Sequence, residues 1–242
     1  MIYPDINCDI GEGIGDDEAM IHYISSASIA CGYHAGNDET MKAAIRLCQK
    51  HQIHIGAHPS FHDRENFGNT DLFVPYSELY DLVQKQIFHL NSLATELGAS
   101  LHHVRLHGAL YFMTARVKSL AAVVALAVKE TTLDLILYGL SNSHTVNEAK
   151  KIGVKTWCEV LAERTYADDG RLTAKLKTTA FLETERAVLS QINDIVTTGF
   201  VTSTGGKKIA IEADTVCIQN DGKHALQFAK ALANIYKKNN TP

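Results

Sequence analysis

The chain lacks paired cysteines, which limits the kind of site and the compartment that it fits. Its 242 residues include five cysteines, an odd number, and no CxxC pair occurs among them. They lie far apart and mostly within apolar segments, at positions 8, 31, 48, 158 and 217. This pattern argues against a disulfide framework and against a structural zinc site, and it predicts reduced, buried thiols. Cys8 and Cys31 lie nearest to the polar clusters described below, so they are the two to test as nucleophiles.

An excess of basic charge, a secretion signal and a long apolar run are also missing. The chain has 23 Lys and Arg against 27 Asp and Glu, a net charge of -4 with neutral His, and its basic residues are scattered. We therefore expect no nucleic-acid partner and no binding to an anionic membrane surface. The N-terminal stretch MIYPDINCDI has neither the basic start nor the apolar core of a signal peptide. No run approaches the roughly 18 apolar residues of a membrane span, so we expect a cytoplasmic protein without a membrane partner.

Nucleotide-binding motifs are absent as well. The glycine-rich stretch Gly11–Gly15 lacks the GxGxxG spacing and carries Glu12 where a pyrophosphate would lie, which argues against a dinucleotide site. The stretch Thr204–Lys208, TGGKK, does not meet the P-loop pattern. The chain by itself therefore shows no ATP motif.

What the sequence does contain is a regular alternation of β-prone apolar runs with amphipathic segments. We expect strands near Ile2–Cys8, Ser28–Cys31, Ile53–Ala57, His102–Leu106, Leu133–Tyr138, Lys155–Val160 and Lys208–Ile218. We expect helices near Asp17–Ile24, Asp38–His51, Ser77–Leu97, Ser119–Glu130, Thr145–Ile152, Glu183–Thr198 and Lys223–Lys237.

Such βα alternation indicates a parallel sheet covered by helices, either closed into a barrel or open and doubly wound. Seven strands, one fewer than the usual eight, favour an irregular seven-stranded (β/α) barrel, formed by residues 1–242 as one domain. The region from Asp168 to Gly206 has the weakest strand signal. Because Asp169-Gly170 and Gly205-Gly206 are turn signals, this region is expected to form a subdomain or a β-hairpin excursion.

Five polar clusters directly follow apolar runs, and they are the main functional signal. They are NCDIGEG at 7–13, ACGYHAGND at 30–38, GAHP at 56–59, HGALY at 107–111 and EVLAERTY at 159–166. In a (β/α) barrel the carboxyl ends of the strands form the active-site face. The sequence therefore places titratable groups at the mouth of the predicted barrel.

The first cluster contributes Asn7, Asp9 and Glu12. Alternate residues of a strand point the same way, so Asn7 and Asp9 are expected on one face, with Glu12 following the turn at Gly11. A carboxylate there can act as a base, bind a metal or orient a histidine. The alternative is that these carboxylates cap the next helix or are solvated. Three polar residues at the end of one strand favour a functional role.

Three histidines, His34, His58 and His107, follow three different strands and are expected to face Asp9. Together with Asp9 and Glu12 they are the catalytic candidates. Asp9, His58 and His107 also have the ligand types of a divalent transition-metal site, although no pair on one helix or strand supplies two ligands locally. The other nine histidines are expected on helix faces or in loops, solvated or packed: His22, His51, His54, His62, His89, His102, His103, His144 and His224.

In the last cluster, Arg164 lies close to Glu159, Glu163 and Tyr166. Such an Arg forms either a structural ion pair or a bidentate clamp on a substrate carboxylate. Its position at the same edge as the other clusters favours substrate binding by Glu159 and Arg164, together with Asn7.

These motifs, in this order and over nearly the whole chain, resemble those of the LamB/YcsF family, whose members form the A subunit of prokaryotic ATP-dependent 5-oxoprolinase. The resemblance implies an irregular (β/α) barrel similar to the glycoside hydrolase and polysaccharide deacetylase fold. It further implies opening of the 5-oxoproline lactam to glutamate with separate B and C subunits and with ATP, accompanied by Mg²⁺, as co-substrate. In that reaction Asp9 or a histidine would activate water, Asn7 would hold the oxyanion and Arg164 the substrate carboxylate.

The chain departs from the family pattern at several positions. Leu106 stands where Pro usually precedes the HGALY histidine, and Glu163 replaces Asp. The stretch Asn66–Thr70, NFGNT, lacks the two arginines of a GFGRR-like motif, and Cys217–Asp221, CIQND, lacks the histidine of a CVHGD-like motif. These changes point to an altered substrate or lost activity. Two alternatives therefore stay open: a stand-alone metal-dependent hydrolase or deacetylase, and a non-catalytic subunit of the complex.

Overall fold

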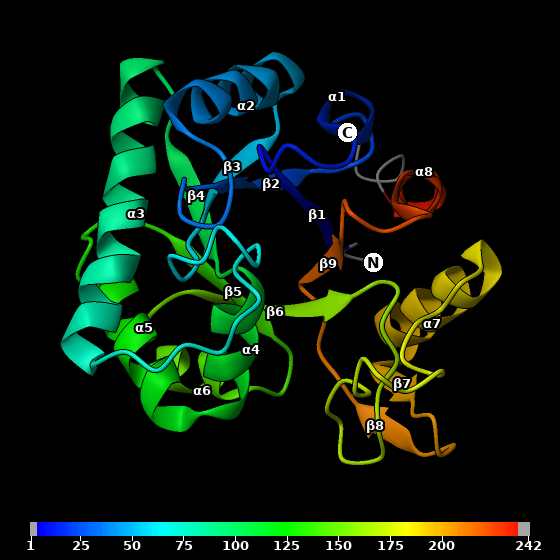
Figure 1. Ribbon diagram of the computed structural model, residues 1–242. Helices are drawn as coiled ribbons and strands as arrows, with labels where there is room; N and C mark the ends of the chain where they lie inside the picture. The colour runs from blue at the N-terminus through cyan, green and yellow to red at the C-terminus, as the bar shows by residue number, and fades with distance from the viewer. Residues whose placement is uncertain (1–3, 237–242) are drawn as a thin grey trace.

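The computed structural model describes residues 4–236 and contains a closed barrel of parallel strands surrounded by helices (Figure 1). The strands follow each other around the barrel as β1 (Asp5–Ile10), β2 (Ser26–Ala30), β3 (His54–His58), β4 (Leu101–Arg105), β5 (Ile136–Leu140), β6 (Thr156–Leu161) and β9 (Thr215–Ile218). Strand β9 pairs with both β6 and β1 and so closes the ring. The predicted seven-stranded barrel is confirmed. Residues 2–3 of the first expected strand and residue 237 of the last expected helix lie outside the described residues.

The helices are α1 (Asp17–Met20), α2 (Asp38–His51), α3 (Tyr76–Glu96), α4 (Gly108–Arg116), α5 (Lys118–Lys129), α6 (His144–Lys151), α7 (Glu185–Thr198) and α8 (Ala225–Tyr236). All the expected helices are present, with ends that differ by a few residues. Helix α2 begins with a capping box, in which Asn37 accepts a hydrogen bond from the Thr40 amide, as its sequence favours. Helix α4 was not among the helices expected from the sequence.

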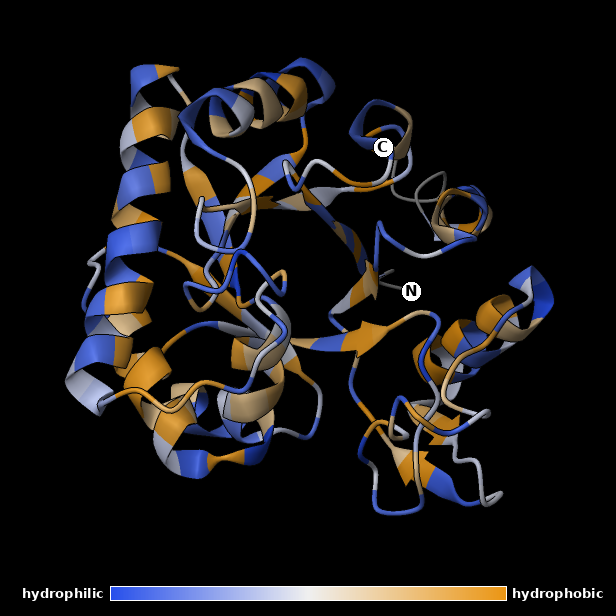
Figure 2. Ribbon diagram, in the orientation of Figure 1, coloured by the Kyte–Doolittle hydropathy of each residue, from blue (hydrophilic) through white to orange (hydrophobic). Residues whose placement is uncertain are grey.

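The long helix α3 shows how the helices cover the barrel. Its apolar side chains at 79, 83, 87 and 90 are buried, and Figure 2 shows apolar and polar residues alternating along it at helical spacing. Gln86, the one polar residue on this stripe, is also buried, and its amide bonds both the N–H and the C=O of Ser60. The helix therefore fixes the loop that follows β3.

One expected strand was wrong. The segment Lys208–Ile218 forms two strands: β8 (Lys208–Ala210) pairs antiparallel with β7 (Phe200–Thr202), and only β9 belongs to the barrel. The hairpin turns where the Gly206 amide bonds the Ser203 carbonyl, as the Gly205-Gly206 signal predicted. In Figure 1 this hairpin and α7 lie to one side of the barrel, between β6 and β9 in the chain. The expected excursion is confirmed.

The positions of three histidines differ from expectation. His54, His102 and His103 lie in strands β3 and β4, not on helix faces or in loops. His103 is completely buried, stacks on Tyr138 at 4.1 Å between ring centroids and lies 3.2 Å from the Ser28 hydroxyl. Of the three, only His103 is buried inside the barrel, whereas His102 is half-buried and His54 is exposed.

All five cysteines are buried free thiols, as predicted. Within the described residues no single helix is long and apolar enough to cross a membrane. Taken together, α4 and α5 would meet that test of length and composition, but they are bent by 116° at their junction.

Candidate functional site

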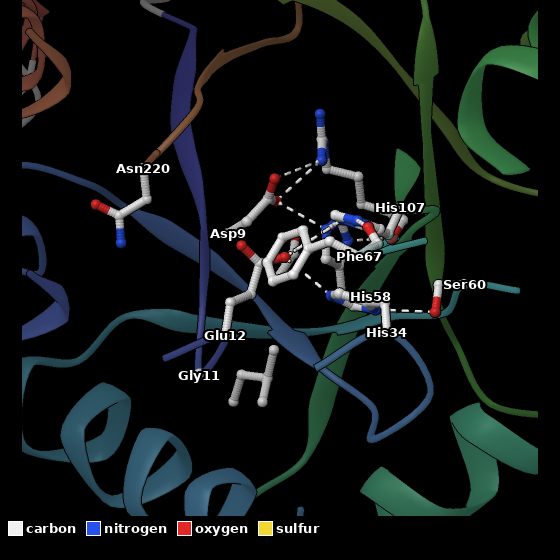
Figure 3. A network of polar contacts seen from close by, with 12 residues as sticks. Asp9, Gly11, Glu12, His34, His58, Ser60, Phe67, His107 and Asn220 are labelled. Atoms are coloured by element: carbon white, nitrogen blue, oxygen red, sulfur yellow. Dashed lines mark hydrogen bonds and ion pairs between the residues drawn. The ribbon is translucent and has the colours of Figure 1, made fainter. Parts of the chain in front are cut away.

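The carboxyl ends of the first four strands bring the predicted catalytic residues together. Asp9 lies in β1, Glu12 follows it, His34 follows β2, His58 ends β3 and His107 precedes α4. Figure 3 shows these side chains pointing toward one another. One ligand atom from each of Glu12, His34, His58 and His107 lies within 4.8 Å of all the others, an arrangement that could hold a metal ion. We call these four residues the His/Glu cluster.

The contacts within the His/Glu cluster are short. Glu12 Oε1 lies 2.9 Å from His34 Nε2, 3.3 Å from His107 Nδ1 and 3.7 Å from His58 Nε2. His107 Nδ1 lies 3.0 Å from His58 Nε2, and the rings of His34 and His107 stack at 3.7 Å. This cluster shares His58 and His107 with the expected metal candidates and contains Glu12 and His34 in place of Asp9.

Asp9 instead binds Arg105, a residue that sequence reasoning missed. Arg105 points into the barrel from β4, and its Nη1 donates to both Asp9 carboxylate oxygens at 2.9 and 3.0 Å. Its Nε donates to both oxygens of Glu159 at 2.7 and 2.9 Å. Asp9 still lies beside the cluster, since its Oδ1 is 3.4 Å from His58 Nε2. The signal was an Arg two residues before His107, between the apolar residues Val104 and Leu106.

These contacts set the charges at the mouth of the barrel. Burial alone would raise the pKa of Asp9, but Arg105 and His58 outweigh it and hold the pKa well below its usual range. Burial likewise opposes ionisation of Glu12, yet its short contacts with His107 and His34 lower its pKa to about 2. Burial lowers the pKa of His34 to about 4. At neutral pH the site therefore contains two carboxylates and an uncharged His34.

Asn7 and Glu159 do not contact the cavity at the barrel mouth. Both are completely buried, and Asn7 Nδ2 donates to Glu159 at 3.0 Å and to Thr215 Oγ1 at 2.6 Å. The Tyr111 hydroxyl also donates to Glu159, at 2.6 Å. Asn7 and Glu159, the two residues expected to bind substrate, form a layer below the mouth that holds Arg105 in place.

Arg164 lies at the cavity, but two of its guanidinium nitrogens donate to backbone carbonyls. Its Nη2 donates to the Thr173 carbonyl at 2.6 Å and its Nε to the Ala180 carbonyl at 3.3 Å. The guanidinium also lies over the Phe181 ring, 4.8 Å from its centroid. Arg164 therefore anchors the chain between β6 and α7, and with it the residues next to Thr173.

A cavity of about 520 Å³ opens above the site. Asp9, Glu12, His107 and Lys175 are among the residues that line it. Asn69, Gln219, Asn220 and Asp221 also line it, so both stretches that depart from the family motifs face the same space. A substrate in this cavity would meet Asp9 and the accessible edge of the His/Glu cluster.

Comparison with known proteins agrees with this geometry. The model of the LamB/YcsF family matches residues 4–242. A protein of Bacillus cereus strain AH187, named as the A subunit of 5-oxoprolinase, is 37% identical over 241 residues, covering 97% of this chain and 95% of the relative. The protein of the same name from Staphylococcus carnosus strain TM300 is 39% identical over 233 residues, covering 94% of this chain and 92% of the relative.

A solved structure has the same fold. The crystal structure of the lactam utilization protein from Thermus thermophilus superposes with a TM-score of 0.93 at 31% identity, covering 98% of this chain and 97% of that one. With the matched family model and these full-length relatives, the chain belongs to the LamB/YcsF family.

Proposed function

We propose that this chain is the A subunit of an ATP-dependent 5-oxoprolinase, a cytoplasmic single-domain protein that works with B and C subunits. Relatives that carry the name of this A subunit, 37 to 39% identical over nearly the full length, support this assignment. The solved relative is described as a lactam utilization protein, and 5-oxoproline is a lactam. The cavity of about 520 Å³ is of a size suited to a small substrate.

The proposed reaction has to activate a poor electrophile, the carbonyl of the lactam. A lactam carbonyl resists attack by water, and transfer of a phosphoryl group from ATP, with Mg²⁺, to its oxygen makes the ring carbon reactive. Attack of water on that carbon forms a C–O bond and breaks the ring C–N bond, which leaves an acyl phosphate of glutamate. A second water releases inorganic phosphate and gives glutamate, so the hydrolysis of ATP to ADP and phosphate drives a ring opening that is otherwise unfavourable. Because this chain has no recognisable ATP motif, we assign ATP binding to the assembly with the B and C subunits.

We propose that Asp9 orients the attacking water. The guanidinium of Arg105 keeps Asp9 ionised and fixes both of its oxygens, and Asp9 lines the cavity. An ionised, immobile carboxylate can accept a hydrogen bond from water and orient it towards the substrate. Glu12 and the three histidines lie beside it and complete the polar wall. The oxyanion role expected of Asn7 is withdrawn, since Asn7 does not reach the cavity.

We propose that Lys175, and not Arg164, binds the carboxylate of the substrate. Among the residues that the structure describes, no carboxylate forms an ion pair with Lys175, whose ammonium lies 5.5 Å from the Phe112 ring centroid. Burial, together with the nearby Arg164, lowers the pKa of Lys175, and a bound carboxylate would relieve that cost. Arg164 contributes indirectly, because it holds Thr173, two residues before Lys175.

The observation that carries this proposal is the placement of Asp9, clamped by Arg105, in the wall of a small cavity in a full-length member of the family. The test is reconstitution with the B and C subunits of the same organism. Glutamate and ADP should form from 5-oxoproline and ATP only when this chain is present. Equal glutamate formation by the B and C subunits without it would refute the assignment.

A stand-alone metal-dependent hydrolase remains the second candidate, because the His/Glu cluster could hold a metal ion. The two functions differ in what they need. Hydrolysis of a cyclic or acetylated amide by this chain alone, with added Zn²⁺ and without ATP, would favour the second. Dependence on ATP and on both partners would favour the first.

A further inference from the structure

We propose that Glu12, His34, His58 and His107 bind one divalent ion of a first-row transition metal. The inference rests on where the hydrogen atoms of these side chains must lie. It concerns binding by this chain's own residues and does not depend on the function proposed above.

The protons of His58 and His107 are fixed by backbone carbonyls. His58 Nδ1 lies 2.7 Å from the Arg105 carbonyl oxygen, and His107 Nε2 lies 2.8 Å from that of Phe67. A carbonyl can only accept, so each of these ring nitrogens carries the proton, and the other nitrogen of a neutral ring is left with a lone pair. Those two remaining nitrogens, His58 Nε2 and His107 Nδ1, face each other at 3.0 Å. Two lone pairs at that distance repel unless a positive charge lies between them.

The proton of His34 is fixed in the same way through a hydroxyl. Ser60 Oγ donates its hydrogen to the Phe61 carbonyl at 3.0 Å, so it accepts from His34 Nδ1 at 2.8 Å. The lone pair of His34 Nε2 therefore points at Glu12 Oε1, 2.9 Å away. Three imidazole lone pairs and a carboxylate oxygen converge on one point, and every histidine has its second nitrogen held by an acceptor, as metal-bound histidines do.

The spacing and rigidity fit an ion. A tetrahedral site with bonds of about 2.0–2.1 Å has ligand atoms roughly 3.4 Å apart, and the contacts that involve Glu12 Oε1 span 2.9 to 3.7 Å. Gln86 holds both backbone groups of Ser60, so the partner of His34 is itself fixed. Glu12 and His107 line the cavity, which gives an ion a path from solvent and leaves one side open to a ligand.

The ligand types select the class of metal. Imidazole suits Zn²⁺, Fe²⁺, Co²⁺ and Ni²⁺, whereas Mg²⁺ and Ca²⁺ prefer oxygen ligands. The Mg²⁺ that accompanies ATP is therefore not expected in this site. Asp9 stays outside the ligand set because it is not part of the converging group of four, and its carboxylate pairs with Arg105.

The test is metal uptake by the full chain after removal of metals with a chelator. Titration with Co²⁺ or Zn²⁺, followed by calorimetry and by the visible absorption of Co²⁺, should give one ion per chain, and Mg²⁺ should give none. With the metal at about 100 times its Kd, the Tm should rise by about 5–10 °C. His58→Gln should abolish uptake. Ser60→Ala, which removes only the acceptor behind His34, should weaken affinity by about 10- to 100-fold and keep the stoichiometry.

The control is His89→Gln, because His89 forms a histidine and carboxylate pair with Asp38 at 2.8 Å on the surface. It should bind metal as the unchanged chain does. The alternative is that shared protons, not a metal, lie between the four side chains. Less than about one ion per ten chains at saturating Zn²⁺ or Co²⁺ would overturn the proposal in favour of shared protons. Unchanged uptake by both His58→Gln and Ser60→Ala would overturn it in favour of a metal site elsewhere on the chain.

Discussion

Replacing Arg105 with methionine should strongly destabilise the barrel. Arg105 and Glu159 are almost completely buried, as is Asp9, and the guanidinium makes four hydrogen bonds to the two carboxylates. Removing it leaves two buried carboxylates without a counterion. Breaking a buried ion pair in this way costs about 3–5 kcal/mol. That is a large part of the roughly 5–15 kcal/mol by which domains are stable, so Arg105→Met is expected to be marginally folded.

The loss of stability in Arg105→Met should also depend on pH, and the environment of Asp9 determines whether the loss grows or shrinks as the pH rises. In the unchanged chain the pKa of Asp9 is depressed, so its contribution to stability is complete above its unfolded value near 3.9 and is lost only as the pH falls below that. In Arg105→Met, burial without Arg105 raises the pKa, so the penalty grows as the pH rises above about 4. Urea unfolding of both proteins at pH 7.5 and pH 5 should therefore show a smaller difference in the free energy of unfolding at pH 5.

Arg116→Met is the matched control, since Arg116 forms a half-exposed ion pair with Asp71. Such a pair contributes about 0–1 kcal/mol, with no comparable pH effect in this range. If Arg105→Met lost no more stability than Arg116→Met, the network around Arg105 would not hold the barrel mouth together. A difference in the free energy of unfolding between Arg105→Met and the unchanged chain that was the same at pH 7.5 and pH 5 would also contradict the account. The loss of stability could then not come from two buried carboxylates without a counterion.

Three further predictions concern other parts of the site. Burial raises the pKa of Glu163 to about 7, so ionising Glu163 costs stability as the pH rises between about 4.5 and 7. Glu163→Gln should therefore be more stable than the unchanged chain by on the order of 1–3 kcal/mol at pH 8. Urea unfolding should show that this difference becomes smaller at pH 5. Gly68 has φ +69°, and a Cβ added there would lie 2.7 Å from His107. Gly98 has the same φ but open space around it, so it is the control. Gly68→Ala should therefore lower the Tm more than Gly98→Ala does. Lys175→Met should raise KM for 5-oxoproline in the reconstituted enzyme by roughly 10-fold or more with little change in kcat, and an unchanged KM would remove Lys175 from substrate binding.

Much of the barrel could be predicted because local patterns and tertiary structure agree. Alternating apolar runs and amphipathic segments fix the order of the elements, and the glycine, Asp and His residues after each run mark the carboxyl ends of the strands. The His/Glu cluster was foreseen in part for this reason. The sequence did not show which carboxylate belongs to the cluster, because the choice between Asp9 and Glu12 depends on Arg105, a side chain from β4 that is distant in sequence.

The errors share a physical cause. Arg105, Asn7 and Glu159 form a polar layer inside the barrel, and a buried charge is stable there only because three strands bring its partners together. Single-sequence patterns assign polar side chains to the surface or to a ligand and so miss such networks. The strand expected over Lys208–Ile218 failed similarly, because β-prone sequence cannot show that its two halves pair with different partners.

The most direct test is the rate of ATP-coupled glutamate formation by the reconstituted enzyme with Asp9→Asn, compared with Asp134→Asn. Asp134 lies on the surface, where it pairs with Lys155. Asp9→Asn should lower the rate by at least about 100-fold, because the clamped carboxylate that orients water is lost, while Asp134→Asn should act like the unchanged chain. Glutamate formation by Asp9→Asn at the unchanged rate would contradict the placement of the reaction at this barrel mouth.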